Sequence, residues 1–487
     1  MLYCIDKRLF IKYNIKSIIT LYKKTVKRVC IMSTNRSSFT GKIGFVLAAA
    51  GSAVGLGNIW RFPYLAAKYG GGFFLLVYIA LSITFGFSLM VAEIAIGRKT
   101  QQSPLGAFRS LNKRFSFLGV LASIVPIIIF PYYSVIGGWV VKWFAGFVSG
   151  QTAKMAADGF FGNYIGKTGE PILWFGIFIA IAAIIVLCGV EKGIEKVSKV
   201  MMPLLVVLML FIVIYTTVTV DGAWEGVLYY ITPDFSDFSF NKLIMTVLAA
   251  MGQLFYSMSL AMGIMVTYGS YMKKDVSIES AVHQVEWFDT GVAFLAGLMI
   301  VPATFAFSGG DPVALGAGPK LMFVTLPKVF DTMPGGSVIG ALFFAMVFLA
   351  ALTSAISLME TIVATFLDKV KIGRKACSML VLAGGFLLGL PSSLGYSAWS
   401  SVTILGMQFL DFFDFISNNL LMPVVALVTS ILVGFIIKPQ TVIEEVELSG
   451  KFKWKKMFTV MIRYIAPIFL VLILVSSVLN AFGVIKI

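Results

Sequence analysis

The chain consists mainly of long apolar runs separated by short polar connections. A run of about 20 apolar residues can cross a bilayer as a helix, and eleven runs reach this class. We expect spans at residues 43–65, 72–97, 117–148, 171–189, 198–218, 241–270, 284–307, 337–366, 376–390, 406–437 and 458–485. Several runs are too long for one straight crossing, which predicts tilted or broken helices. The pattern therefore predicts an all-α polytopic membrane protein.

The first apolar run is interrupted by glycines and polar residues. Its sequence there is Gly51-Ser-Ala-Val-Gly-Leu-Gly-Asn-Ile-Trp-Arg-Phe-Pro63. Glycine weakens a helix by about 1 kcal/mol relative to alanine, and an ionisable residue such as Arg61 at membrane depth indicates a functional site. Backbone released from a helix inside a bilayer is tolerated only where protein or a cavity satisfies it. We expect a break near Val54–Gly57; the alternative is a close-packed helix interface of small residues.

The sixth run repeats this feature, with the sequence Gly252-Gln-Leu-Phe-Tyr-Ser-Met-Ser-Leu-Ala-Met-Gly263. Two interrupted segments at corresponding places in two halves are typical of transporters built from inverted repeats. Their half-helix ends attract anions at the N-terminus and cations at the C-terminal carbonyls. We divide the chain into a basic N-terminal extension, a first repeat with helices 1–5, a second repeat with helices 6–10, and a cytoplasmic loop with helix 11. The boundaries are 1–31, 32–218, 219–437 and 438–487.

Composition supports the membrane assignment. The chain is 59% hydrophobic and 13% charged, whereas about a quarter of a soluble domain is charged. In a soluble protein the net charge of +16 would indicate a nucleic-acid partner. Here Lys and Arg gather in alternate connections, so the positive-inside rule is the better account, and no nucleic acid is expected. We expect a multi-pass protein of the cell (inner) membrane with a cytoplasmic N-terminus and an external C-terminus.

Residues 1–31 do not fit this pattern, because they lack the apolar core and cleavage motif of a signal peptide. They could form an amphipathic surface helix, but we favour a mis-assigned start with Met32 as the initiator. The four cysteines imply no disulfide framework, and the single histidine, His283, excludes a His-based metal site. No nucleophile–His pair, metal cluster or phosphate loop indicates an enzyme.

The interrupted first run, together with Gly70-Gly-Gly-Phe73 and Glu93-Ile-Ala-Ile-Gly-Arg98, resembles the neurotransmitter:sodium symporter family. The helix-six string, Tyr132-Tyr133 and Ala350-Ala-Leu-Thr-Ser354 support the resemblance. It extends from about Arg36 to the end of the tenth span. It implies a LeuT-like 5+5 inverted repeat with broken helices 1 and 6 and about eleven transmembrane helices. The implied function is sodium-coupled symport of neutral, apolar or aromatic, L-amino acids by alternating access.

The resemblance also implies two sodium sites, whose oxygen ligands suit a hard cation. The first would use Ala53, Asn58, Ser257 and Asp289 together with the substrate carboxylate. The second would use Gly51, Val54, Ala350, Thr353 and Ser354. For the hydroxyls of the last two residues, the alternative is back-bonding to the preceding helical turn.

Asp289 is expected to remove any chloride requirement. Chloride-dependent members of the family carry an amide at this position and a serine one turn later, where this chain has Asp289 and Ala293. Tyr78, Gln253 and Ser257 match the remaining chloride positions. A fixed carboxylate would supply the negative charge that chloride supplies elsewhere. The alternative is that Asp289 lies near the cytoplasmic end and reaches water.

The same mapping implies a substrate site and two gates. The substrate-binding residues would be Ser52, Ala53, Leu56, Gly57, Tyr133, Tyr256, Ser257, Ser259, Met262, Ser354 and Leu358. Met262 is flexible and polarizable, which favours a broad range of apolar and aromatic side chains. The outer gate would pair Arg61 with Asp414 under a lid of Tyr133 and Tyr256, and the inner gate would use Arg36, Asp368 and Tyr271.

Gly193 and Pro203 resemble the family's glycine–proline pair that permits local unwinding of helix 5. A simple proline kink is the alternative. Two other functions stay open at this point. One is a proton- or cation-coupled transporter of another substrate, with Asp289 carrying the proton, and the other is a non-transporting sensor or channel.

Overall fold

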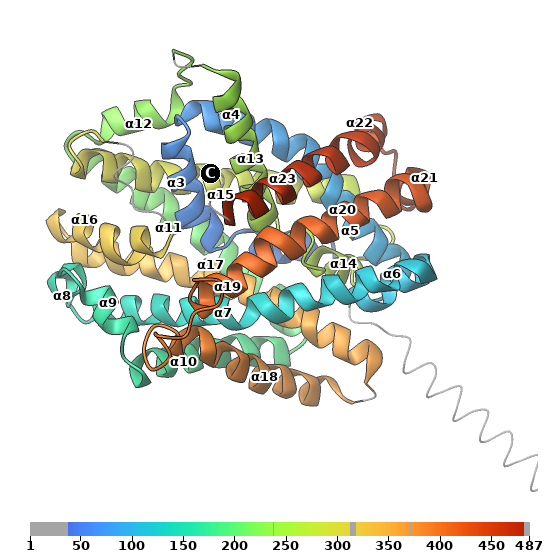
Figure 1. Ribbon diagram of the computed structural model, residues 1–487, viewed down its shortest axis with the longest axis horizontal. Helices are drawn as coiled ribbons and strands as arrows, with labels where there is room; N and C mark the ends of the chain where they lie inside the picture. The colour runs from blue at the N-terminus through green and yellow to red at the C-terminus, as the bar shows by residue number, and fades with distance from the viewer. Residues whose placement is uncertain (1–37, 237, 312–317, 371, 482–487) are drawn as a thin grey trace, which may run out of the picture. The chain divides into compact units, whose positions relative to one another are not determined.

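The computed structural model describes residues 38–236, 238–311, 318–370 and 372–481. The chain divides into residues 1–38 and 39–487, and only the second unit is described below. The N-terminal extension (1–31) and Arg36 lie outside the described residues. Within those residues the fold is helical, with only isolated two-residue bridges in place of strands (Figure 1).

The helices follow the predicted apolar runs. Those of the first half are α2 (Lys42–Ala53), η1 (Gly57–Arg61), α3 (Phe62–Lys68), α4 (Gly72–Leu81), η2 (Ser82–Gly86), α5 (Phe87–Thr100), α6 (Pro104–Leu111), η3 (Lys113–Phe115), α7 (Ser116–Val148), α8 (Thr152–Ala156), α9 (Phe160–Ile165), α10 (Gly169–Leu187), η4 (Val190–Glu195) and α11 (Lys196–Thr219). Those of the second half are α12 (Ala223–Ile231), α13 (Phe240–Ser257), α14 (Ile264–Gly269), α15 (Ile278–Phe307), η6 (Leu321–Thr325), α16 (Leu326–Thr332), α17 (Gly336–Lys369), α18 (Arg374–Leu394), α19 (Phe409–Asp414), η7 (Phe415–Leu421), α20 (Met422–Ile431), η8 (Leu432–Ile436), α21 (Pro439–Glu447), α22 (Lys455–Val460), η9 (Met461–Ile465) and α23 (Ala466–Ala481).

Nine helices in the described part of the chain are long and apolar enough to cross a membrane. The pair Lys42–Ala53 and Gly57–Lys68 passes the same test as one span bent by 55°. The predicted sixth run forms α13 and α14, so each of the eleven predicted runs contains helix. Large apolar side chains such as Val207, Leu387 and Ile468 are exposed on these helices, as expected of surfaces that face lipid.

Both predicted helix breaks are confirmed. α2 ends at Ala53, and Val54 adopts an extended conformation before η1 begins at Gly57. The second break separates α13 from α14 and contains left-handed backbone at Ser259 (φ 52°), Ala261 (φ 60°) and Gly263 (φ 72°). Left-handed backbone costs a residue with a Cβ about 1–3 kcal/mol, so the surrounding structure has to hold this segment open.

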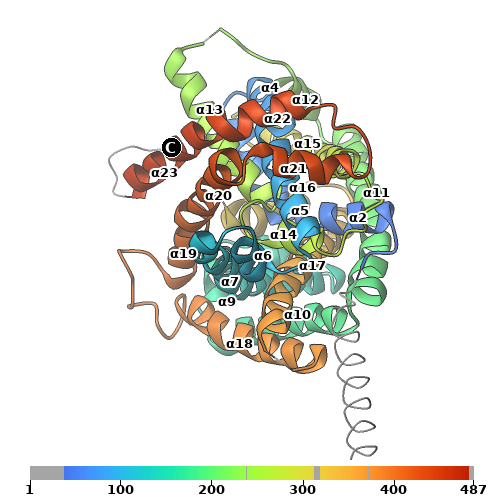
Figure 2. The ribbon, with the colours of Figure 1, turned by 90° about the vertical axis from the view of Figure 1, so that its right-hand side faces the viewer.

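The two breaks lie inside a bundle of helices from both halves of the chain. α7 packs against α17, α10 and α18, while α15 packs against α2 and α14 against α5. Figure 1 shows α8, α9, α12 and α16 at one end of this bundle and α6, α21 and α22 at the other. Figure 2 looks onto the second end. The broken segments therefore lie at mid-depth, away from both ends.

Helix 5 carries the glycine and proline noted in the sequence. The π-helix η4 precedes α11 and contains Gly193, whereas Pro203 lies inside α11. A Cβ at Gly193 would lie 2.1 Å from the carbonyl oxygen of Ile185, so only glycine fits this approach. The wide η4 turn and the internal proline both leave backbone groups outside the regular α-helical ladder.

Candidate functional site

The carboxylate of Asp289 is the centre of a buried polar cluster between the two breaks. Asn58, just past the break in helix 1, donates its Nδ2 to Asp289 Oδ1 at 2.8 Å and to Ser257 Oγ at 2.9 Å. Ser257, at the end of α13, lies 2.8 Å from Asp289 Oδ2. The side chains of all three residues are fully buried. The alternative that Asp289 reaches water is therefore wrong for this structure.

Two further side chains complete this cluster. Tyr78 of α4 lies 3.5 Å from Asp289 Oδ2 and 3.3 Å from Ser257 Oγ. Gln253 of α13 donates its Nε2 to the carbonyl oxygen of Gly57 at 3.0 Å, and its buried Oε1 has no hydrogen-bond partner among the described residues. Of the positions matched to the chloride-dependent pattern, Tyr78 and Ser257 contact the Asp289 carboxyl group, whereas Gln253 contacts the backbone next to Asn58.

The predicted second cation site gathers oxygens of α17 and of the break in helix 1. Ser354 Oγ lies 3.2 Å from the carbonyl oxygens of both Ser52 and Val54. Thr353 Oγ1 lies 3.0 Å from the carbonyl oxygen of Ala350, which is the back-bonding considered as the alternative. α2 packs closely against α17 at this level. A Cβ added at Gly51 would lie only 3.3 Å from Thr353 Cβ. The donor set consists of oxygens only, which fits a hard cation.

A cavity of about 20 Å³ lies between the two breaks. Its lining combines broken-helix residues with apolar side chains of α7 and α17, namely Ser52, Ala53, Gly55, Ile129, Tyr133, Tyr256, Ser259, Met262, Ile264, Ser354 and Leu358. A volume of this size holds about one water molecule, so a larger ligand requires the lining side chains to move outward.

Most of the predicted substrate-binding residues meet at this cavity, including Tyr133, Tyr256, Ser259, Met262 and Leu358. Leu56, Gly57 and Ser257 do not line it directly. The amide of Leu56 donates to Tyr133 Oη at 3.3 Å, and Ser257 belongs to the Asp289 cluster. A Cβ at Gly57 would lie 2.2 Å from the ring of Tyr256, so Gly57 lets this ring close over the break.

Sequence reasoning missed four residues of the cavity region, and one of them, Gly55, was named only within the interrupted first run. Ile129 and Ile264 line the cavity, but an isoleucine in an apolar span differs in no way from its neighbours. Ser357 donates to Ser52 Oγ at 2.8 Å, and Ser52 in turn lies 3.0 Å from Ser259 Oγ. The three hydroxyls link α17 to both breaks. In the sequence, the only sign of a role for Ser357 is its position three residues after Ser354.

Glu93 of α5 binds the backbone of the second break. From the sequence it was named only as part of the Glu93–Arg98 motif. Its Oε1 accepts the amide of Ala261 at 2.7 Å, at one of the left-handed residues. The side chain is 2% exposed, and its Oε2 has no hydrogen-bond partner among the described residues. Burying a carboxyl group in an apolar span is costly. Its hydrogen bond to the Ala261 amide indicates that Glu93 fixes the backbone of the second break.

Replacing Glu93 by leucine is expected to reduce transport by about tenfold or more, because a buried amide left without an acceptor costs about 1–3 kcal/mol. Glu93→Gln keeps a carbonyl oxygen for the Ala261 amide and should retain much more activity. Initial uptake rates, normalised to protein in the membrane, check this prediction. Equal losses in the two variants would show that the charge matters rather than the hydrogen bond.

The predicted outer gate is only partly assembled. Asp414 accepts hydrogen bonds from Asn418 Nδ2 at 2.6 Å and from Tyr132 Oη at 3.1 Å. Arg61 is near enough to interact with Asp414 electrostatically, but among the described side chains it makes no direct ion pair. The predicted direct Arg61–Asp414 ion pair is therefore absent among the described side chains, and the hydrogen bonds from Tyr132 and Asn418 both go to Asp414 Oδ1.

The predicted inner gate is represented by Tyr271 and Asp368. Asp368 Oδ2 accepts the amide of Ser103 at 2.6 Å. Tyr271 donates to Glu360 Oε1 at 2.7 Å, and Glu360 forms an ion pair with Arg374. Glu360 and Arg374 were not predicted, although a glutamate inside an apolar span is itself a signal.

Two broken helices around a buried polar cluster and a small cavity are the features of a secondary transporter built from inverted repeats. Comparison with known proteins agrees with this class. The sequence profile described as "Sodium:neurotransmitter symporter family" matches residues 36–156 and 147–484. The chain belongs to this family, which consists of transporters rather than enzymes.

Individual relatives cover nearly the whole chain. A sodium-dependent transporter of Haemophilus influenzae is 32% identical over 92% of this chain and all of its own length. A sodium-dependent transporter of Bacillus subtilis is 34% identical, covering 90% of this chain and 97% of its own. The crystal structure of MhsT in complex with L-phenylalanine matches with a TM-score of 0.81 and 36% identity, covering 91% of this chain and 100% of that one. The protein is thus a sodium-dependent membrane transporter with the LeuT fold.

Proposed function

We propose that this chain is a symporter that imports neutral, apolar or aromatic, L-amino acids together with sodium. The observation that carries the proposal is the position of the cavity between the two breaks. Backbone groups released at the breaks offer partners to an α-amino group and an α-carboxylate, and the apolar part of the lining includes Ile129, Met262 and Leu358. The bound L-phenylalanine of the structural neighbour supports the same substrate class.

The proposal includes two sodium ions. Ala53, Asn58, Ser257 and Asp289 would hold one, and Gly51, Val54, Ala350, Thr353 and Ser354 would hold the other. Each set contains oxygen donors, and the first contains a buried carboxylate. A cation at the first set lies next to the cavity, so a substrate carboxylate there would make the two ligands bind cooperatively. Sodium dependence of the family distinguishes this proposal from a proton-coupled transporter.

Alternating access would use the contacts at the two ends of the cavity. Tyr133 and Tyr256, with Arg61 and Asp414 beyond them, would close the outer side. Tyr271 and Asp368, with Glu360 and Arg374 on the same side, would close the inner one. The N-terminus would lie in the cytoplasm, because the Lys-rich connections between α5 and α7, α17 and α18, and α20 and α22 share one end of the bundle.

Met262→Phe is expected to shift the preference toward smaller side chains. Met262 lines the cavity and is 4% exposed, so a rigid ring in its place would leave less room for the substrate. A difference of one methylene in such a pocket is worth about 1–3 kcal/mol, or about tenfold in the ratio of leucine to tryptophan uptake. Competition curves for both amino acids measure this ratio. An unchanged ratio would place the side-chain pocket elsewhere.

Uptake into reconstituted vesicles tests the proposed function. Labelled L-phenylalanine should accumulate under an inward sodium gradient, and L-leucine should compete whereas L-lysine should not. A charged side chain would lose its hydration in this cavity without a partner, which costs several kcal/mol. Accumulation of a substrate of another chemical class, with no competition by these amino acids, would contradict the proposal.

A further inference from the structure

A basic segment at the end of the bundle shown in Figure 2 is used by neither the cavity nor the gates. It has the sequence Lys451-Phe-Lys-Trp-Lys-Lys456 and joins α21 to α22. Its four lysines are exposed, whereas Phe452 is 2% exposed. We call these six residues the basic segment. The segment thus buries the Phe452 ring against the protein and leaves its lysine side chains exposed on the surface.

The backbone of the basic segment is fixed to the bundle. Glu279 at the start of α15 accepts the amides of Lys453 at 3.0 Å and Trp454 at 3.1 Å. The Trp454 ring lies 6.0 Å from that of Phe87 and 5.3 Å from that of His283. The lysines are therefore presented from a docked loop rather than from a free one, which reduces the entropy lost when they bind a ligand.

Three of the lysines have no acidic partner. Lys455 pairs with Glu447 at 3.3 Å, and Glu445 is buried in ion pairs with Arg98 and Lys274. No described residue forms an ion pair or side-chain hydrogen bond with the ammonium groups of Lys451, Lys453 and Lys456. Glu444 is the other acidic residue of α21, and it is exposed. A surplus of positive charge thus remains at this surface.

The basic segment also adjoins the apolar outer surface of the bundle. Lys456 precedes Val460 by four residues, which is about 6 Å along a helix, and Val460 is 49% exposed on the apolar surface. Trp454 of the basic segment is 38% exposed, and Leu448 (61% exposed) and Trp287 (63%) are exposed on other elements. Because tryptophan is enriched where hydrocarbon meets headgroups, exposed Trp454 and Trp287 favour a position of the basic segment at the headgroup level.

We propose that the basic segment binds the headgroups of anionic phospholipids. Lysine clusters directly beside a transmembrane helix attract anionic lipids by about fivefold in affinity per lysine. The partner is thus a monoanionic phosphate diester such as phosphatidylglycerol, held against Lys451, Lys453 and Lys456, with its acyl chains along α22 and α23. This interaction is independent of the substrate and its coupling ion.

Lipid retention by the purified protein tests the proposal. The transporter is equilibrated in detergent with equal amounts of phosphatidylglycerol and phosphatidylcholine, re-purified, and its bound lipids are counted by mass spectrometry. The wild type should be enriched in phosphatidylglycerol, and the K451Q/K453Q/K456Q variant should lose this enrichment by about fivefold or more. The arginine variant K451R/K453R/K456R keeps the charge and should keep the enrichment.

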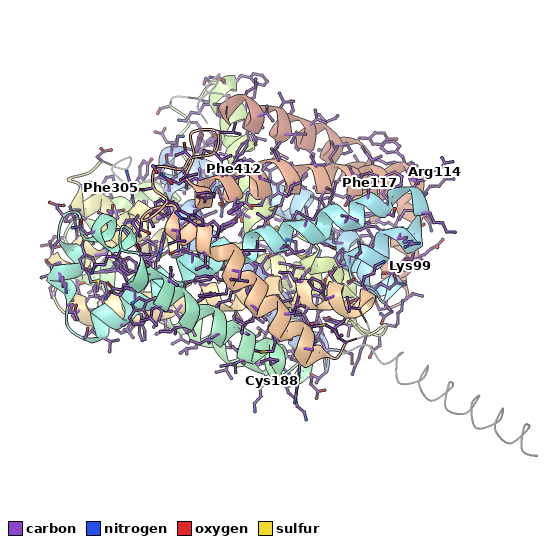
Figure 3. All side chains as sticks on the ribbon, turned by 60° about the horizontal axis from the view of Figure 1, so that its bottom comes forward. Lys99, Arg114, Phe117, Cys188, Phe305 and Phe412 are labelled. Carbon is purple, nitrogen blue, oxygen red and sulfur yellow. The ribbon has the colours of Figure 1, made fainter. Side chains whose placement is uncertain are left out.

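A matched control removes three other exposed lysines from the protein, in K99Q/K113Q/K375Q. These lysines are scattered over α5, η3 and α18, and Figure 3 shows Lys99 near Arg114 at one end of the bundle. This variant has the same net charge as the test variant and should retain the enrichment. Loss in the control equal to that in the test variant, or full retention in the test variant, would overturn the proposal.

Discussion

Alanine at both Thr353 and Ser354 is expected to reduce sodium-driven uptake to near background. The double variant removes the Ser354 hydroxyl, which contacts the break in helix 1, and the Thr353 hydroxyl, which the proposal places in the same sodium site. A contact between a polar group and a charge is worth about 1.5–3 kcal/mol, so the loss of two corresponds to more than about 100-fold in sodium affinity. Sodium activation curves measure the effect directly.

The same double variant should still fold and reach the membrane. Thr353 otherwise bonds only to its own helix, and Ser354 bonds to two carbonyl oxygens and to the hydroxyl of Tyr133, whose buried ring stays in place without it. Ser134→Ala is a suitable control, because Ser134 is a buried serine on α7 that bonds to the preceding turn and does not line the cavity. An unchanged sodium activation curve in the double variant would contradict the second sodium site.

Transport is expected to continue when external chloride is replaced by gluconate. The carboxylate of Asp289 already places a negative charge among Asn58, Ser257 and Tyr78. Asp289→Asn has nearly the same shape, and the amide can still accept from Asn58 and donate to Ser257. The variant therefore removes the charge with little disturbance of packing, and sodium affinity should fall by about tenfold or more.

Addition of chloride to Asp289→Asn provides a sharper test of the charge. Ala293 lies one turn later on α15 and is fully buried, so Ala293→Ser would add a hydroxyl beside the cluster. Chloride is expected to stimulate uptake by the double variant but not by the wild type. Loss of wild-type uptake in gluconate at fixed sodium would show that Asp289 does not replace the anion.

The sequence predicts the fold well because a bilayer restricts the choices. An apolar helix satisfies its backbone hydrogen bonds within a single segment in lipid, so the positions of the spans follow directly from hydropathy. The two breaks could be predicted as well, because glycines, Asn58 and Gln253 contrast with their apolar surroundings. The ends of the helices were less certain, as in α15, which begins at Ile278 rather than at the predicted residue 284.

The candidate site was predicted where polar residues stand out and missed where they do not. Asp289, Asn58 and Ser257 come together as the resemblance implied. Ile129 and Ile264 could not be selected from so many apolar neighbours. The outer gate shows a different limit, because Asp414 binds Tyr132 and Asn418 instead of Arg61. The choice among several nearby partners of a carboxylate depends on side-chain geometry. That geometry cannot be read from the sequence.

The most direct measurement of the central claim is uptake of labelled L-phenylalanine by vesicles that contain the purified protein. With equal internal and external pH, an inward sodium gradient should drive accumulation above the external concentration, and replacement of sodium by potassium should abolish it. Unlabelled L-leucine and L-tryptophan should compete, and L-glutamate should not. Accumulation that persists without sodium, or that no apolar amino acid competes with, would contradict sodium-coupled transport of this substrate class.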